Sequence, residues 1–159
     1  KEYLEHVWAA VAKEALAPFE RNPDEGPYKV QYELQDMMQD LVGIVRVEDE
    51  MVRALGEIEK LKARAAKVWV AGNREYNPGW HTALDLDNLM VVSEAVTRSA
   101  IERKESRGGH FRDDYPNKDP AYSTFNIILR KGPDGEMQVS RQPLPEMRAD
   151  LKQIIEENK

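Results

Sequence analysis

The sequence contains no cysteine among its 159 residues. This absence excludes disulfides, thiolate zinc sites and iron–sulfur ligation within the chain. No apolar run approaches the roughly 18 residues that a membrane-spanning helix needs. Basic residues are also fewer than acidic ones, 23 against 29, which gives a formal net charge of −6. This balance argues against a nucleic-acid-binding module, because such modules carry a basic face.

Glycine is scarce as well, and its nine copies form no nucleotide-binding pattern. The sequence has neither G-x-G-x-x-G nor a P-loop, so we predict no flavin or nicotinamide site within this chain. No serine lies in a G-x-S-x-G elbow. His6, His81 and His110 are too far apart to show a metal-ligand spacing. We therefore predict no catalytic, cofactor-binding or metal-binding residue here.

What the sequence does contain is a regular apolar pattern. Apolar residues make up 41% of the chain and charged residues 33%, a composition typical of one folded domain with its own core. Apolar residues at helical spacing predict four helices, at residues 2–17, 28–45, 48–71 and 82–106. The last three are long and amphipathic and have short connections, which predicts an up-down-up bundle.

Proline, glycine and capping residues set the predicted helix ends. Residues 18–27 hold three prolines and a glycine and are expected to form a linker. The Asn-Pro-Gly run at 77–79 predicts a turn. Thr82 or Asp85 is expected to cap the helix that follows. The glycine pair at 108–109 is expected to supply that helix with a left-handed C-terminal cap.

After about residue 120 the pattern changes. The runs "STFNIILR" and "EMQVSR" read as short strands joined by "KGPDG", which predicts a hairpin. A short polar helix is expected to start near Pro145. The predicted fold is therefore all-α, a three-helix bundle with an N-terminal helix and a small hairpin-and-helix tail. The predicted units are an N-terminal helix and linker, the bundle, and the tail, at residues 1–27, 28–120 and 121–159.

One stretch, "IERKESRGGHFRDDYP" at residues 101–116, holds ten ionisable side chains. Basic residues at a helix C-terminus are expected, because they oppose the negative end of the helix dipole. The polar density continues past the glycines, however, where a helix no longer needs it. Arginine makes planar, two-pronged bonds to carboxylates, which suits a fixed docking surface. We predict interdomain docking contacts at Glu105, Arg107, His110, Arg112 and Asp113.

Other interpretations of these charges remain open. A small-anion site is compatible with the cationic members of the stretch, namely Arg103, Arg107, His110 and Arg112. Neighbouring carboxylates are interpreted as solvated pairs, since perturbed acids need burial that the sequence does not show. These pairs are Asp85 with Asp87, Glu102 with Glu105, and Asp113 with Asp114.

Two segments closely resemble a known family. They are "QYELQDMMQDLVGIVRVEDEM" and "LDLDNLMVVSEAVTRSAIERKESRGGHFRDDYP". Both resemble the C-terminal helical domain of the succinate dehydrogenase/fumarate reductase flavoprotein family, which has relatives in L-aspartate oxidase and adenylylsulfate reductase flavoproteins. The similarity covers about residues 28–120, and its most specific part is R-x-E-S-R-G-x-H-x-R-x-D-Y-P, from Arg103 to Pro116. The resemblance implies a spectrin-like three-helix bundle.

The resemblance also implies a larger parent protein. The bundle would pack on an FAD-binding domain and a capping domain, which would lie before Lys1 and carry the flavin and dicarboxylate sites. The parent would interconvert succinate and fumarate by hydride transfer through FAD. It would pass electrons to a subunit with iron–sulfur clusters and then, through membrane anchor subunits, to quinone. This chain would be a scaffold and docking surface, inactive alone.

The same resemblance implies a location and leaves alternatives. The parent would lie on the cytoplasmic side of the inner or plasma membrane, held there by its partner subunits, and this fragment itself would be soluble. Val47 stands where many relatives have a helix-capping Thr or Asp, and Gly109 where Ala is common. The R-x-D-Y-P ending favours succinate dehydrogenase/fumarate reductase over L-aspartate oxidase, although the tail from Tyr122 is less familiar. A stand-alone helical protein-interaction module remains an alternative.

Overall fold

The computed structural model describes residues 2–158 and is mainly helical, which confirms the all-α prediction. Its helices are α1 (Glu2–Glu20), α2 (Pro27–Val42), α3 (Glu48–Ala65), α4 (Pro78–Glu102), the 3-10 turn η1 (Pro120–Ser123) and α5 (Ala149–Glu157). Its strands are β1 (Val45–Arg46), β2 (Phe111–Arg112), β3 (Phe125–Lys131) and β4 (Met137–Pro143). Within the described residues, no helix is both long and apolar enough to cross a membrane.

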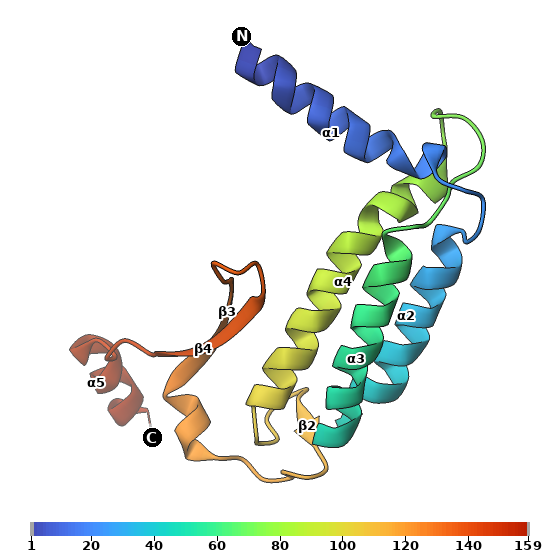
Figure 1. The fold of residues 1–159 in the computed structure, drawn as a ribbon. Coiled ribbons are helices and arrows are strands. Elements are labelled where there is room, and N and C mark those ends of the chain that lie inside the picture. Colours follow the sequence, from blue (N-terminus) through green and yellow to red (C-terminus); the bar gives the residue numbers. More distant parts are fainter. Residues whose placement is uncertain (1, 159) are drawn as a thin grey trace.

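Helices α2, α3 and α4 lie side by side as the predicted bundle (Figure 1). Their apolar stripes meet in one core, whose fully buried members include Val30, Ile58 and Leu86. Burying a side chain of this size contributes about 1.5–3 kcal/mol. The bundle therefore has its own core, and its two ends position the chain segments that follow.

Helix α3 begins at Glu48, as its acidic first turn predicts, but it ends at Ala65 rather than at residue 71. The segment after it is extended. Its backbone N–H groups pair with the chain before α2: Trp69 donates to the Glu25 carbonyl in the linker at 2.9 Å, and Val70 donates to the Pro18 carbonyl in the last turn of α1 at 3.0 Å. Val68 and Val70 are buried in this extended form. Their burial explains why the apolar pattern ran past the helix end.

Helix α1 is longer than predicted, because it continues through Pro18 to Glu20. Tertiary contacts hold its last turn. The Phe19 ring meets the edge of Trp80 with centroids 5.4 Å apart, and Trp80 Nε1 donates to the Ala15 carbonyl at 2.7 Å. The rest of α1 projects away from the bundle with its side chains exposed (Figure 1).

The predicted ends of α2 and α4 are also corrected. Helix α2 stops at Val42, three residues early, because the chain turns into β1. Helix α4 begins at Pro78, because the Asn77 side chain accepts the backbone N–H of Trp80 at 3.1 Å. Neither Thr82 nor Asp85 is the cap, since both lie inside the helix.

The glycine cap predicted for α4 is wrong as well. The helix ends at Glu102, and Arg103 already has an extended conformation. Gly108 does adopt a left-handed φ of +60°, but within a turn in which the Arg107 and His110 backbones pair. The charged stretch is thus a structured loop of its own after the helix.

A short parallel pair that the sequence did not reveal ties this loop to the bundle. Strand β1 pairs with β2, with Val45 opposite Phe111 and Arg46 opposite Arg112. The connection between α2 and α3 therefore holds the loop that follows α4. This pairing brings together charged residues that are far apart in sequence.

The predicted C-terminal hairpin is confirmed. Strands β3 and β4 pair antiparallel, from Phe125 opposite Pro143 to Lys131 opposite Met137. The hairpin lies beside α4, and α5 lies beyond it (Figure 1). Helix α5 starts at Ala149, later than the predicted start near Pro145.

Candidate functional site

The first anchor of the charged loop is the carboxylate of Glu105, which is fully buried. It accepts hydrogen bonds from Arg103 Nη1 at 2.5 Å, from Arg107 Nε and Nη2 at 2.8 and 3.0 Å, and from the backbone N–H of Asp119 at 2.8 Å. Hydrogen bonds from Arg107, opposed by burial and helped by the Asp119 amide, lower the pKa of Glu105 to about 2. The predicted solvated position of this acid is therefore wrong.

The second anchor is the guanidinium of Arg112, which is also fully buried. Its Nη1 donates to the Ala100 carbonyl at 2.9 Å, in the last turn of α4. Its Nε and Nη2 form a two-pronged pair with Asp114 at 2.6 Å each, and Nη2 also reaches Glu48 at 3.1 Å. Hydrogen bonds to Asp114 raise the pKa of Arg112. One side chain thus joins the end of α4 to the start of α3.

Asp114 completes this junction by capping α3. The residue at the N-cap position, Val47, has no side-chain group to accept a hydrogen bond. Instead the Asp114 Oδ2 atom accepts the backbone N–H of Glu48 at 3.0 Å. Hydrogen bonds from Arg112 lower the pKa of Asp114, so the carboxylate stays ionised beside the positive end of the helix dipole. Asp114 is exposed, as predicted, but its carboxylate is engaged in the pair with Arg112 and in the cap of α3.

His110 connects the loop to Arg46. Arg46 Nη1 lies 2.9 Å from His110 Nδ1, and His110 Nε2 lies 3.0 Å from the Arg103 carbonyl. A guanidinium can only donate, so Nδ1 accepts and the proton sits on Nε2. Burial, and then the charges of nearby arginines led by Arg46, lowers the pKa of His110. The imidazole is therefore held neutral between two partners of its own chain.

The five predicted docking residues thus occupy different environments. Glu105 and Arg112 are buried and fully engaged within the chain. Arg107 and His110 are half-buried, and Asp113 is exposed. The structure brings all five into one loop, but only Arg107, His110 and Asp113 reach its surface.

Two hollows flank α4, and the first of them is lined in part by this loop. The first, which we call the arginine hollow, has a volume of about 660 Å³ and lies between α4, the loop and β3. Its walls include Arg46, Arg103, His110, Val96, Ile127 and Leu129. The second, the hairpin groove, has a volume of about 460 Å³ and lies between α3, α4 and the tip of the hairpin.

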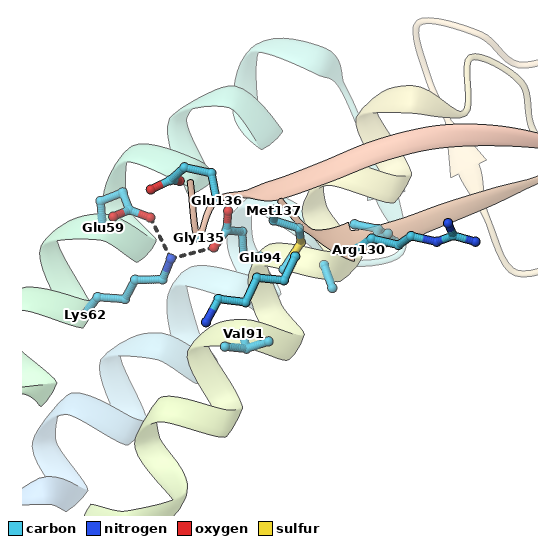
Figure 2. A pocket seen from close by; sticks show the side chains of 11 residues that line it. Glu59, Lys62, Val91, Glu94, Arg130, Gly135, Glu136 and Met137 are labelled. Atoms are coloured by element: carbon cyan, nitrogen blue, oxygen red, sulfur yellow. Dashed lines mark hydrogen bonds and ion pairs between the residues drawn. The ribbon is translucent and has the colours of Figure 1, made fainter. Parts of the chain in front are cut away.

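The hairpin groove contains a neutralised ion cluster (Figure 2). Lys62 points from α3 toward Glu59 and toward the buried Glu94 of α4, with Nζ–O distances of 2.8 and 2.5 Å. Glu94 also pairs with Arg98 at 2.6 Å. Its pKa is lowered by these two cations, although burial opposes them. The cluster crosslinks α3 and α4 and pairs the charged groups that these two helices contribute to the groove.

The chain as a whole matches a known family over most of its length. The family described as fumarate reductase flavoprotein C-term matches residues 31–154. The chain belongs to this fumarate reductase flavoprotein C-terminal family.

Individual relatives agree with this membership. The Sdh1 structure of Mycobacterium smegmatis in complex with UQ1 has a chain that superimposes with a TM-score of 0.86 and 40% identity, covering 96% of this chain and 26% of that one. The succinate dehydrogenase flavoprotein subunit of Coxiella burnetii is 34% identical over 138 residues, which is 85% of this chain and 23% of that subunit. This chain therefore spans about a quarter of the length of such relatives.

L-aspartate oxidase is also a relative, as the sequence analysis expected. The enzyme of Acinetobacter baylyi is 40% identical over 84 residues, which is 53% of this chain and 14% of the relative. The shorter coverage makes this relationship less supported than the relationship to succinate dehydrogenase and fumarate reductase flavoproteins.

The sequence interpretation did not identify three residues that join the start of α3 to the loop after α4. Arg46 and Glu48 lie in the segment where the helical phase is lost. Asp114 belongs to the R-x-E-S-R-G-x-H-x-R-x-D-Y-P string but was not among the predicted docking residues. The usable signal was Val47, a helix start with no capping side chain, which implies that a distant group supplies the cap. No three potential metal ligands gather anywhere in the part of the chain that the structure describes.

Proposed function

We propose that this chain is the C-terminal helical domain of a longer flavoprotein that interconverts succinate and fumarate by hydride transfer through FAD. The observation that carries the proposal is the likeness to the Sdh1 chain, because it extends over 96% of this chain at 40% identity. Membership of a flavoprotein family supports this reading over a stand-alone interaction module.

Within that parent, the proposed role of this chain is to be a scaffold. The buried pairs of Glu105 and Arg112 fix the loop after α4, so the groups at its surface have defined positions. We assign Arg107, His110 and Asp113 to docking against the FAD-binding and capping domains. The loop suits this role because its arginines are already oriented, which lowers the entropy lost when a partner docks.

A second proposed docking element is the exposed apolar side of α1, which we call the α1 stripe. It consists of Tyr3, Leu4, Val7, Trp8 and Val11. These residues are 42–78% exposed and recur at helical spacing, so they share one face. An amphipathic helix normally buries such a face. The proposed cover is the FAD-binding and capping domains of the parent, since this chain spans only about a quarter of the length of its relatives.

The described residues do not fit FAD themselves. A dinucleotide pyrophosphate binds where a strand leads through a glycine-rich turn into a helix N-terminus. The one parallel strand that leads directly into a helix here is β1, among residues 2–158, and the first turn of α3 contains Glu48, Asp49 and Glu50. Three carboxylates would repel a pyrophosphate. We therefore place the flavin in the parent's other domains and derive no chemical step from this chain.

The remaining partners follow from the same proposal. The parent would pass its electrons to a subunit with iron–sulfur clusters, and membrane anchor subunits would hold the complex on the cytoplasmic face of the inner or plasma membrane. The likeness to the Sdh1 structure in complex with UQ1 supports this assembly.

Co-expression with the rest of the parent tests the proposal. We expect the parent lacking this chain to lose flavin and succinate oxidation, and the chain supplied separately to restore both. The chain alone should retain no FAD and oxidise no succinate. Flavin retention with succinate oxidation by the chain alone would contradict the assignment of chemistry to the other domains.

A matched pair of variants tests the α1 stripe in the same assay. Val11→Glu puts a charge in the middle of the stripe, and Ala9→Glu puts the same charge on the opposite face of the exposed helix. We expect Val11→Glu to weaken co-purification with the rest of the parent and Ala9→Glu to leave it unchanged. Equal effects of the two variants would remove the stripe from the interface.

A second candidate function is that of an L-aspartate oxidase, favoured by the 40% identity to the Acinetobacter baylyi enzyme over 84 residues. The reconstituted parent separates the two. Oxidation of succinate in preference to L-aspartate supports the first proposal, and the reverse preference supports the second.

A further inference from the structure

Arg46 is a half-buried cation that has no acidic partner among the described residues. Its Nε donates to the carbonyls of Val42 and Gly43 at 3.0 and 2.9 Å, which end α2, and its Nη1 donates to His110. Within the part of the chain that the structure describes it forms no ion pair, and burial lowers its pKa. Among residues 2–158 no acceptor pairs with the Nη2 group, so a charged donor remains available.

The surroundings of Arg46 differ from those of its neighbours. Arg103 and Arg107 share Glu105, and Arg112 pairs with Asp114 and Glu48. The predicted anion site composed of Arg103, Arg107, His110 and Arg112 therefore has most of its charge already neutralised. That prediction left out Arg46, whose positive charge is not neutralised by a carboxylate of the described residues.

The charge of Arg46 lies in the wall of the arginine hollow, whose other lining groups favour the binding of an anion. Arg46 and Arg103 both line it, and no carboxylate does, although the chain has 29 acidic residues. Val96, Ile127 and Leu129 form an apolar wall. Such a wall excludes water on one side, and charge-assisted hydrogen bonds strengthen when water is excluded.

We propose that the arginine hollow is a binding site for a carboxylate, with Arg46 as its main donor and Arg103 as the second. The carboxylate comes either from a free small dicarboxylate or from an Asp or Glu side chain of another part of the parent protein. In both cases the guanidinium of Arg46 donates to it, and Ser99 and Asn126 at the rim add polar groups. The side-chain source rests on the proposed function, which supplies the parent, whereas carboxylate binding itself can be tested with the chain alone.

The test is an NMR titration of the isotope-labelled 159-residue chain with sodium acetate and with sodium succinate, each compared with sodium chloride at equal ionic strength. We expect saturable shifts of the Arg46 Nε–H signal and of the Ser99 and Asn126 amides, with a dissociation constant of about 1 mM or below for at least one carboxylate. Succinate that binds about tenfold or more tightly than acetate identifies a free dicarboxylate. Equal affinities show that the site takes a single carboxylate, which is the group that an Asp or Glu side chain of the parent supplies.

Two variants and one control make the result specific. Arg46→Gln should abolish the shifts, and Arg74→Gln, in the exposed loop before α4, should preserve them while removing the same charge. Because Arg46→Gln also removes hydrogen bonds to the end of α2, Asn126→Asp provides a second variant that deletes no described side-chain hydrogen bond. Its new carboxylate should occupy the hollow and suppress binding of both probes.

Two outcomes would overturn the proposal. The first is that neither carboxylate shifts these signals more than chloride does in the wild-type chain. The second is that the Asn126→Asp chain binds the probes as well as the wild type, because the shifts would then arise from another place.

Discussion

The Asp114 carboxylate accepts a hydrogen bond from the backbone N–H of Glu48 at 3.0 Å, although 66 positions separate the two residues. This contact gives α3 a cap that its own N-terminal residues do not provide. Because Asp114 also holds Arg112, the start of α3 and the end of α4 depend on the same few side chains. The predictions below test that dependence and the attachment of α1.

A local cap should strengthen α3 further. Val47→Thr introduces a side-chain oxygen at the N-cap position, where Val47 makes no cap hydrogen bond. We expect a gain of about 0.5–1 kcal/mol in the free energy of unfolding, measured by urea denaturation. Val52→Thr, an exposed position inside the same helix, is the control and should give no gain. A similar change in both variants would show that the effect is not capping.

Removing Arg112 should destabilise the chain severely. Arg112→Ala leaves Asp114 and Glu48 without their buried partner and leaves the Ala100 carbonyl without its donor. Breaking a buried pair in this way lowers the free energy of unfolding by about 3–5 kcal/mol. Arg53→Ala, at an exposed position on α3, should change it by less than about 0.5 kcal/mol. Urea midpoints of the two variants decide the matter, and equal midpoints would refute the assigned role of Arg112.

Glu105 should govern part of the acid sensitivity. Its pKa is about 2 in the folded chain, below the ordinary value of 4.5. A depressed pKa contributes stability that is present above pH 4.5 and is lost as the pH falls toward 2. In the Glu105→Gln variant, the free energy of unfolding should therefore depend less steeply on pH within that window. Glu75→Gln, in an exposed loop, should leave the wild-type slope intact.

Trp80 should control the attachment of α1. Trp80→Phe keeps an aromatic ring against Phe19 but removes the hydrogen bond to the Ala15 carbonyl, a loss of about 0.5–1.5 kcal/mol. We expect faster amide hydrogen exchange in the last turns of α1 and little change in the core of α2 and α3. Uniformly faster exchange across the bundle would mean that Trp80 supports the whole fold instead.

The sequence was sufficient where local chemistry decides the structure. The acidic first turn predicted that α3 begins at Glu48, and "KGPDG" between strand-like runs predicted the hairpin, with Gly135 at a φ of +88° in its turn. In both places the residues that determine the conformation are close neighbours along the chain.

The sequence was insufficient where partners are distant. The pairing of Arg46 with His110 and the capping of Glu48 by Asp114 depend on the β1–β2 pair, whose two-residue strands give no periodic signal. The burial of Glu105 follows from the bend that Arg103 begins, which an assumed helix to residue 106 concealed. Charge density predicted that this loop matters, but not which of its charges face inward.

Helix α1 is a rod of 19 residues that is anchored to the bundle only near its last turn. At 1.5 Å per residue its length is about 28 Å, so a tilt of about 5° at the Trp80 end would move the far tip by about 2 Å. A slight change in ring packing around Phe19 would therefore be amplified along α1. The displacement at the opposite end would be comparable to a hydrogen-bond length, and any surface that contacts that end would move with it.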